Sequence, residues 1–135
     1  LERVLSDGRL AYWTFSPGIG IYSVPMDPIT GNPTGNPILL TVGRYGAPSP
    51  DGSMVAYNSF DYGTGSYSAG GLHIVSSDGR DDERVPIKGV VNPFSSGWFL
   101  DGKSPLAGGF DSNWRRGIYR VDISTGNIET FFKRN

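Results

Sequence analysis

The sequence predicts an all-β protein built from three repeats of a four-stranded unit. Glycine occurs 20 times and proline 10 times in the 135 residues, and aromatic residues make up 13% of the chain. This composition is typical of short strands joined by tight turns, because glycine and proline interrupt helices and supply the backbone angles of turns. No window shows an apolar period of 3.6 residues, whereas several short segments alternate apolar and small residues with a period of two.

Three short patterns recur in the same order along the chain. The first is an Asp-Gly turn followed by an apolar stretch, and its copies at Asp7, Asp51 and Asp101 lie 44 and 50 residues apart. The second is glycine, an aliphatic residue, a ring, any residue and valine, at 20–24, 71–75 and 117–121. The third is a glycine turn shortly afterwards, at Gly31, Gly79 and Gly126. A period in the forties is typical of the four-stranded blades of a β-propeller.

Each repeat contains four segments of strand length, which we call A to D in chain order. In the first repeat they are 3–5, 10–14, 20–25 and 38–42. In the second they are 45–49, 54–59, 72–76 and 83–87, and in the third 97–100, 104–109, 118–122 and 128–132. The sequence therefore predicts one arc of three antiparallel blades, which span about 1–43, 44–91 and 92–135.

The Asp-Gly turns have a clear structural role. A carboxylate at the start of a turn accepts hydrogen bonds from backbone N–H groups, and glycine adopts the positive φ that other residues resist. We therefore interpret six residues as parts of structural turns: Asp7, Gly8, Asp51, Gly52, Asp101 and Gly102.

Around Ser49-Pro50-Asp51-Gly52 the sequence resembles the TolB-like family of β-propeller repeats, also called PD40 or WD40-like repeats. The third repeat matches the same pattern at Trp98, 101–103 and 118–122, but it has Phe99-Leu100 where the family has Ser-Pro. The resemblance implies a propeller fold and a periplasmic or extracellular location. Similar propellers occur in periplasmic assembly factors, in front of serine peptidases and in other extracellular proteins, so the resemblance alone assigns no activity.

Three blades do not close a propeller, since closed rings use roughly four to eight. Each blade packs against two neighbours, so an arc of three leaves two apolar faces open, and burying apolar surface is worth about 25 cal/mol per Å². We expect either the rest of a longer chain or a second copy to cover these faces. If the chain is complete as given, the prediction is a homodimer that forms a six-bladed propeller around a twofold axis.

No catalytic or metal-binding motif is recognised in the sequence. It has one histidine, His73, and no cysteine, so a nucleophilic triad or a histidine-rich metal site would depend on that residue alone. His73 occupies the position of Tyr22 and Tyr119 in the other repeats, which favours a ring packed within a blade. The run Asp81-Asp82-Glu83 is flanked by arginines, and we interpret it as a solvated, charge-balanced turn. We therefore expect no catalytic residue, no metal and no cofactor.

Two loops between strands B and C carry the residue types of recognition surfaces. The loop over 60–68 combines tyrosine with glycine and serine, and the loop over 111–116 contains tryptophan and arginine. Tyrosine provides contact area at low entropic cost, and tryptophan and arginine dominate many interfaces. B–C loops of successive blades emerge on one face of a propeller, so we expect these loops to be neighbours. The candidate binding residues are Phe60, Tyr62, Tyr67, Trp114, Arg115 and Arg116.

The leading hypothesis is a non-enzymatic binding module that recognises a protein or a glycan through this face. One alternative is the propeller part of a larger enzyme, such as a prolyl-oligopeptidase-like hydrolase, a lyase or a glycosidase. Another is a purely structural, self-assembling half-propeller. The near balance of 12 basic and 13 acidic residues argues against nucleic acid as a partner. No apolar run approaches the roughly 20 residues of a membrane span.

Overall fold

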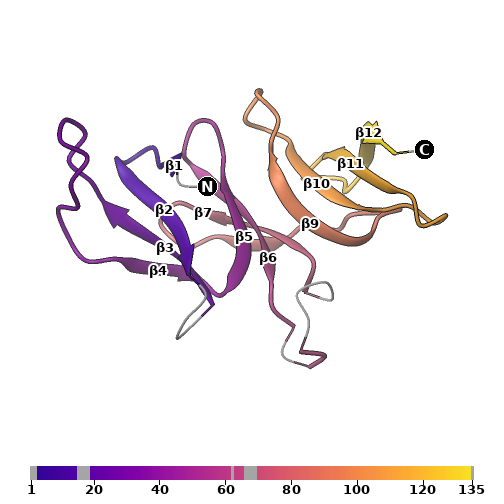
Figure 1. Ribbon diagram of the computed structural model, residues 1–135, viewed down its shortest axis with the longest axis horizontal. Coiled ribbons are helices and arrows are strands. Elements are labelled where there is room, and N and C mark those ends of the chain that lie inside the picture. The colour runs from indigo at the N-terminus through magenta and orange to yellow at the C-terminus, as the bar shows by residue number, and fades with distance from the viewer. Residues whose placement is uncertain (1–2, 15–18, 62, 66–69, 135) are drawn as a thin grey trace.

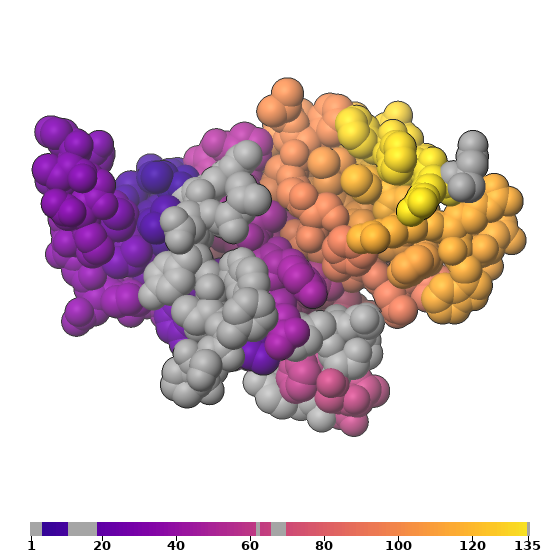
Figure 2. Space-filling view, viewed as in Figure 1, coloured from indigo at the N-terminus to yellow at the C-terminus, as the bar shows by residue number. Residues whose placement is uncertain are grey.

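The computed structural model describes residues 3–14, 19–61, 63–65 and 70–134. These residues form three four-stranded sheets, and in each sheet every strand pairs with its neighbours in sequence. All strand pairs are antiparallel. Figure 1 shows the sheets in a row, with the second between the first and the third, and the chain colours of Figure 2 follow the same order. The predicted all-β fold of three four-stranded antiparallel blades is confirmed.

The first blade consists of β1 (Arg3–Val4), β2 (Arg9–Thr14), β3 (Gly20–Pro25) and β4 (Ile38–Thr41). The second consists of β5 (Gly43–Pro48), β6 (Met54–Ser59), β7 (Leu72–Ser76) and β8 (Asp82–Arg84). The third consists of β9 (Val91–Trp98), β10 (Pro105–Phe110), β11 (Arg116–Val121) and β12 (Ile128–Lys133). Strands β3, β6 and β7 have the bounds that the sequence predicts. Among the described residues no helix is long and apolar enough to span a bilayer.

The predicted strand A of the third blade is wrong in its position. We expected 97–100, whereas β9 covers Val91–Trp98. Residues 99–102 form a turn instead, because the Phe99 N–H donates to the Ser104 carbonyl and the Gly102 N–H donates to the Phe99 carbonyl. In the second blade, β8 ends at Arg84 rather than at 87. Pro86 has no N–H with which to continue the ladder.

Two apolar clusters hold the three blades together, and β6 contributes to both. Val55 and Tyr57 face the first blade, whereas Ala56 between them faces the third. This alternation follows from the period of two along a strand. The first cluster contains Leu5, Ile21, Leu40, Val55, Tyr57 and Val75. The second contains Ala56, Leu72, Ile74, Val85, Ala107 and Val121.

Polar contacts join the second blade to the third beside the apolar cluster. The Trp98 indole N–H donates to the Ala47 carbonyl at 2.6 Å, which ties β9 to β5. The side chain of Asn58, on β6, donates to the Pro93 carbonyl at 2.7 Å and accepts the Ser95 N–H at 2.7 Å. Strand A of the third blade is therefore fixed on the second blade by hydrogen bonds as well as by apolar packing.

Each end of the arc presents a sheet face that no described blade covers. In the third blade Ile118 occupies the position of Leu72, which in the second blade packs against its following neighbour. Phe132 pairs with Ile118 and its side chain is exposed. In the first blade Val24 occupies the position of Val75, which packs against a preceding blade, although Val24 itself is only 6% exposed. The two terminal faces are thus equivalent to faces that are buried inside the arc.

Candidate functional site

A cleft of about 770 Å³ lies between the innermost strands of the second and third blades, β5 and β9. It lies at the edge of the sheets where β5, β9 and β11 begin and the B–C loops are found, which we call the B–C loop end. Gly65, in the B–C loop of the second blade, forms part of its wall. The described residues that line it are Arg44, Tyr45, Asn58, Gly65, Asn92, Pro93, Phe94, Ser95, Ser96 and Arg116. The lining residues of the cleft therefore come from both blades and from a B–C loop.

Two residues with left-handed backbone shape this cleft. Tyr45 on β5 has φ 57° and Asn92 on β9 has φ 51°. Residues other than glycine rarely adopt this region, and such residues are concentrated at functional sites. The pairing of β5 with β6 shifts register between Arg44 and Ala47, so Tyr45 lies in an interruption of the ladder. Its side chain is 48% exposed.

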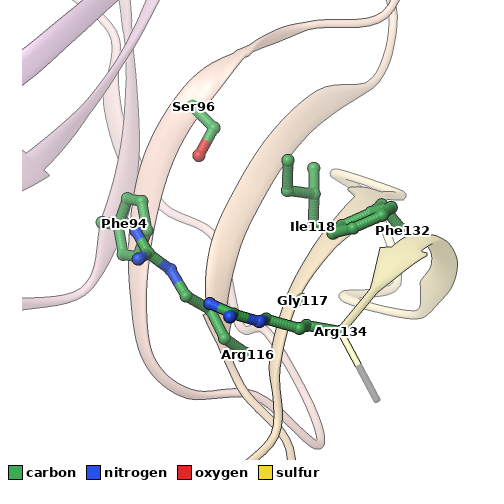
Figure 3. Close-up of a pocket in the computed structure, with 7 residues that line it drawn as sticks. All are labelled: Phe94, Ser96, Arg116, Gly117, Ile118, Phe132 and Arg134. Atoms are coloured by element: carbon green, nitrogen blue, oxygen red, sulfur yellow. The ribbon is translucent and has the colours of Figure 1, made fainter.

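An aromatic and cationic row crosses the cleft. The ring centroids of Tyr45 and Phe94 are 6.4 Å apart, and their planes are inclined by 56°. The Arg116 guanidinium carbon lies 5.9 Å from the centroid of Phe94. Figure 3 shows the guanidinium of Arg116 beside the Phe94 ring. The row therefore joins β5, β9 and β11 at one wall.

The cleft and its surroundings carry positive charge. None of the described residues that line it is acidic, and two are arginines. An adjoining cavity of about 340 Å³ shares Phe94, Ser96 and Arg116 and adds Arg134. The Arg134 N–H donates to the Arg116 carbonyl at 3.0 Å, so the two arginines lie on paired backbone. In the described part of the chain, no ion pair involves either guanidinium.

The carboxylate of the neighbouring loop is already engaged. Asp111 pairs with the Lys133 ammonium and accepts the N–H groups of Asn113 and Arg115, both at 2.9 Å. The Lys133 hydrogen bond first, and then these backbone donors, lower the pKa of Asp111 to about 2. Asp111 therefore stays ionised at neutral pH and serves to hold the 111–115 turn and the end of β12.

The structure places the six predicted binding residues in different settings. Arg116 lines the cleft, whereas Trp114 and Arg115 are exposed on the adjacent loop. Trp114 has φ 58°, is 67% exposed and lies 5.8 Å from the Phe110 ring. Phe60 is half-buried just beyond β6. Two of the predicted residues, Tyr62 and Tyr67, lie outside the described residues.

The innermost strands contribute residues that the sequence did not indicate. Tyr45, Asn92, Phe94 and Ser96 line the cleft but were not among the candidates. Three of them belong to β9, which was expected six residues later in the chain. An aromatic residue beside an arginine at Arg44-Tyr45 is a signal in the sequence, but nothing in it indicates the left-handed backbone.

A second polar cluster lies where the first blade meets the second, and it corrects one interpretation. The Tyr57 hydroxyl donates to Asp82 at 2.6 Å, the Thr41 hydroxyl lies 3.0 Å from Asp82, and His73 Nδ1 lies 3.2 Å from it. Burial, and then the Asp82 hydrogen bond, raise the pKa of Tyr57 well above its usual range. Asp82 is exposed, as predicted, but the prediction that it belongs to a turn is wrong, because Asp82 starts β8 and its carboxylate accepts these hydrogen bonds. The His73 ring packs 5.5 Å from that of Tyr57.

The Asp-Gly turns have the following geometry. The carboxylates accept backbone N–H groups two residues on: Asp7 from Arg9 at 3.2 Å, Asp51 from Ser53 at 3.1 Å and Asp101 from Lys103 at 2.9 Å. The glycines that follow have positive φ: Gly8 81°, Gly52 71° and Gly102 68°. Among the described residues, no group of three His, Cys, Asp or Glu side chains is placed to hold a metal ion.

Three solved propellers resemble this chain in structure. TolB from Acinetobacter baumannii matches with a TM-score of 0.64 and 22% identity over 96% of this chain and 31% of its own. A putative TolB from Agrobacterium tumefaciens matches with a TM-score of 0.62 and 22% identity over 96% and 47%. The β-propeller domain of the Trilobed protease from Pyrococcus furiosus matches with a TM-score of 0.59 and 15% identity over 99% and 41%.

These matches show that the chain has the β-propeller fold. No protein-family model matches the sequence, and no curated protein matches it significantly. The chain spans less than half the length of the three propellers named above.

Proposed function

We propose that this propeller arc is a non-enzymatic binding module that recognises a protein or a glycan at its B–C loop end. The observation that carries the proposal is the cleft between β5 and β9, with Arg116 on its wall and Trp114 and Arg115 exposed on the loop beside it. Rigid sheets hold the site, and exposed tryptophan and arginine are the side chains that most often dominate binding energy.

The test compares two double variants on printed arrays of glycans and peptides. Trp114→Asn with Arg115→Ala removes the exposed loop side chains, and asparagine tolerates the left-handed backbone at 114. Leu100→Ala with Lys103→Ala is the matched control, since both residues are exposed in the turn at the far end of β9. We expect only the loop variant to lose the array signals, with melting temperatures of both within about 4 °C of the wild type. Unchanged signals in the loop variant would refute the proposal.

The second part of the proposal concerns the open faces of the terminal blades. Their residues occupy positions that are buried inside the arc, so further blades of the same kind fit them. The occupants are either other blades of a longer chain or a second copy of this one, which would complete a six-bladed ring. The purely structural alternative, a self-assembling half-propeller, shares this requirement. Light scattering of the purified chain tests self-association: a dimer supports it, and a soluble, folded monomer contradicts it.

The propeller part of a larger enzyme is the second candidate function. The resemblance to the propeller domain of the Trilobed protease favours it, because that propeller belongs to a protease. The discriminating observation is whether the gene continues into a hydrolase region with a nucleophile elbow. The two TolB matches support a periplasmic or other extracytoplasmic location, which fractionation of the source cells would test.

A further inference from the structure

The cleft between β5 and β9 combines the side chains that acidic sugars require. Two of the lining side chains already make hydrogen bonds within the protein. Asn58 bonds to the backbone of β9, and the Ser95 hydroxyl donates to the Ala56 carbonyl. Asn92 and Ser96, by contrast, have exposed side chains that make no hydrogen bond within the described part of the chain. An amide and a hydroxyl are donors and acceptors of the kind that bind sugar hydroxyls.

Aromatic faces and a guanidinium stand beside these polar groups. The Tyr45 ring is half-exposed, and it is followed across the cleft by Phe94 and then by Arg116. The face of an aromatic ring carries negative potential, which attracts the C–H groups of a pyranose ring. A guanidinium binds a carboxylate through paired, charge-assisted hydrogen bonds. No described lining residue is acidic, so an anionic ligand meets no like charge there.

The backbone of the cleft argues against an extended peptide as the occupant. A peptide that adds to a sheet needs an uninterrupted strand edge with regular N–H and C=O groups. Both candidate edges are interrupted, because Tyr45 and Asn92 are left-handed.

We propose that this cleft binds an acidic oligosaccharide, with a uronate carboxylate held by Arg116 and a sugar ring packed on Tyr45 and Phe94. This assignment rests on the proposed function, because it names the ligand class of the same loop end. Asn92 and Ser96 then bind hydroxyl groups of the ligand. A cleft of about 770 Å³ lies in the range of small-ligand sites.

The experiment is calorimetric titration of the full chain with α-1,4-linked trigalacturonate. The comparison ligands are its methyl ester, neutral maltotriose and an acetylated peptide of alternating glutamate and glycine. Arg116→Met removes the guanidinium but keeps an apolar stem, and Tyr45→Asn removes the ring at a left-handed position. Lys103→Met is the matched control, because it removes an exposed positive charge from the turn between β9 and β10.

We expect trigalacturonate to bind at least about tenfold more tightly than its ester or maltotriose, because a hydrogen bond to a charged group is worth about 1.5–3 kcal/mol. Arg116→Met should weaken it about tenfold or more and Tyr45→Asn measurably, whereas Lys103→Met should leave it unchanged. Absence of binding, equal binding of the neutral sugars, or equal affinities of Arg116→Met and Lys103→Met would overturn the proposal. Tighter binding of the peptide, lost in Trp114→Asn, would overturn the saccharide assignment but leave the loop-end binding module standing.

Discussion

Removing the side chain of Asn58 should uncouple the second blade from the third. Asn58 is 1% exposed, and its amide satisfies the Pro93 carbonyl and the Ser95 N–H, each at 2.7 Å. In Asn58→Ala both backbone groups lose their partner in a water-poor contact between blades. A buried polar group left without a partner costs about 1–3 kcal/mol, so for the two groups we expect a loss of about 2–6 kcal/mol. Domains of this size are stable by only about 5–15 kcal/mol, so this loss is a large share.

Urea denaturation followed by circular dichroism measures the change. With a slope of about 2 kcal/mol per M, the midpoint should fall by about 1–3 M. Asn58→Leu fills most of the volume but satisfies neither backbone group, so it should be destabilising as well. Asn127→Ala, at an exposed position beside β12, should change the midpoint little. A loss below about 1 kcal/mol in Asn58→Ala, or unchanged hydrogen exchange at the Ser95 amide, would refute the reasoning.

Two further predictions concern a turn and a carboxylate. Gly126 and Gly31 both have φ 71°, but a Cβ at Gly126 would lie 1.8 Å from the Pro86 carbonyl oxygen, whereas one at Gly31 meets nothing within 4 Å. Thermal unfolding should therefore show a loss of about 1–2 kcal/mol for Gly31→Ala and about 2–5 kcal/mol for Gly126→Ala, and equal losses would contradict the packing argument. The lowered pKa of Asp111 means that its ionised form stabilises the fold above its unfolded pKa of about 3.9, and that this contribution disappears as the pH falls towards 2. Asp111→Asn should thus be less stable than the wild type at pH 7 and converge with it near pH 2, and a constant difference across that range would contradict the assignment.

The sequence predicts well those strands whose two faces are both buried between neighbouring blades. In β6 every residue from Val55 to Asn58 is buried, and in β7 Leu72, Ile74 and Val75 are buried, so the apolar pattern marks both strands at their true bounds. In β9 only Ser95 is buried, and the pairing with β10 shifts register twice. The apolar pattern is lost there, so the sequence misplaces this strand onto the apolar residues of the following turn.

The sequence predicts the candidate site only in part. Arg116 was found because tryptophan and arginine in a loop are conspicuous in composition. The cleft itself depends on the backbone at Tyr45 and Asn92 and on the approach of β5 to β9 across two blades. Neither feature is a local property of the sequence, since the residue type tyrosine does not indicate a left-handed backbone. Composition can therefore indicate a candidate loop, whereas the geometry of the cleft depends on the fold.

Several of the recurring turn glycines lie where one blade contacts the preceding blade. A Cβ at Gly52 would lie 2.2 Å from the Ser6 amide nitrogen, and one at Gly79 would lie 3.3 Å from the Leu40 carbonyl oxygen. The same turns of the first blade, at Gly8 and Gly31, meet nothing within 4 Å. Positive φ alone explains Gly8 and Gly31, and also Gly102, where a Cβ would meet only Pro50 Cδ at 4.0 Å. At Gly52, Gly79 and Gly126 the absence of a side chain also lets the preceding blade approach. The first blade has the same turn geometry with that space empty, so its two turns leave room for the contacts that the turns of the second blade make.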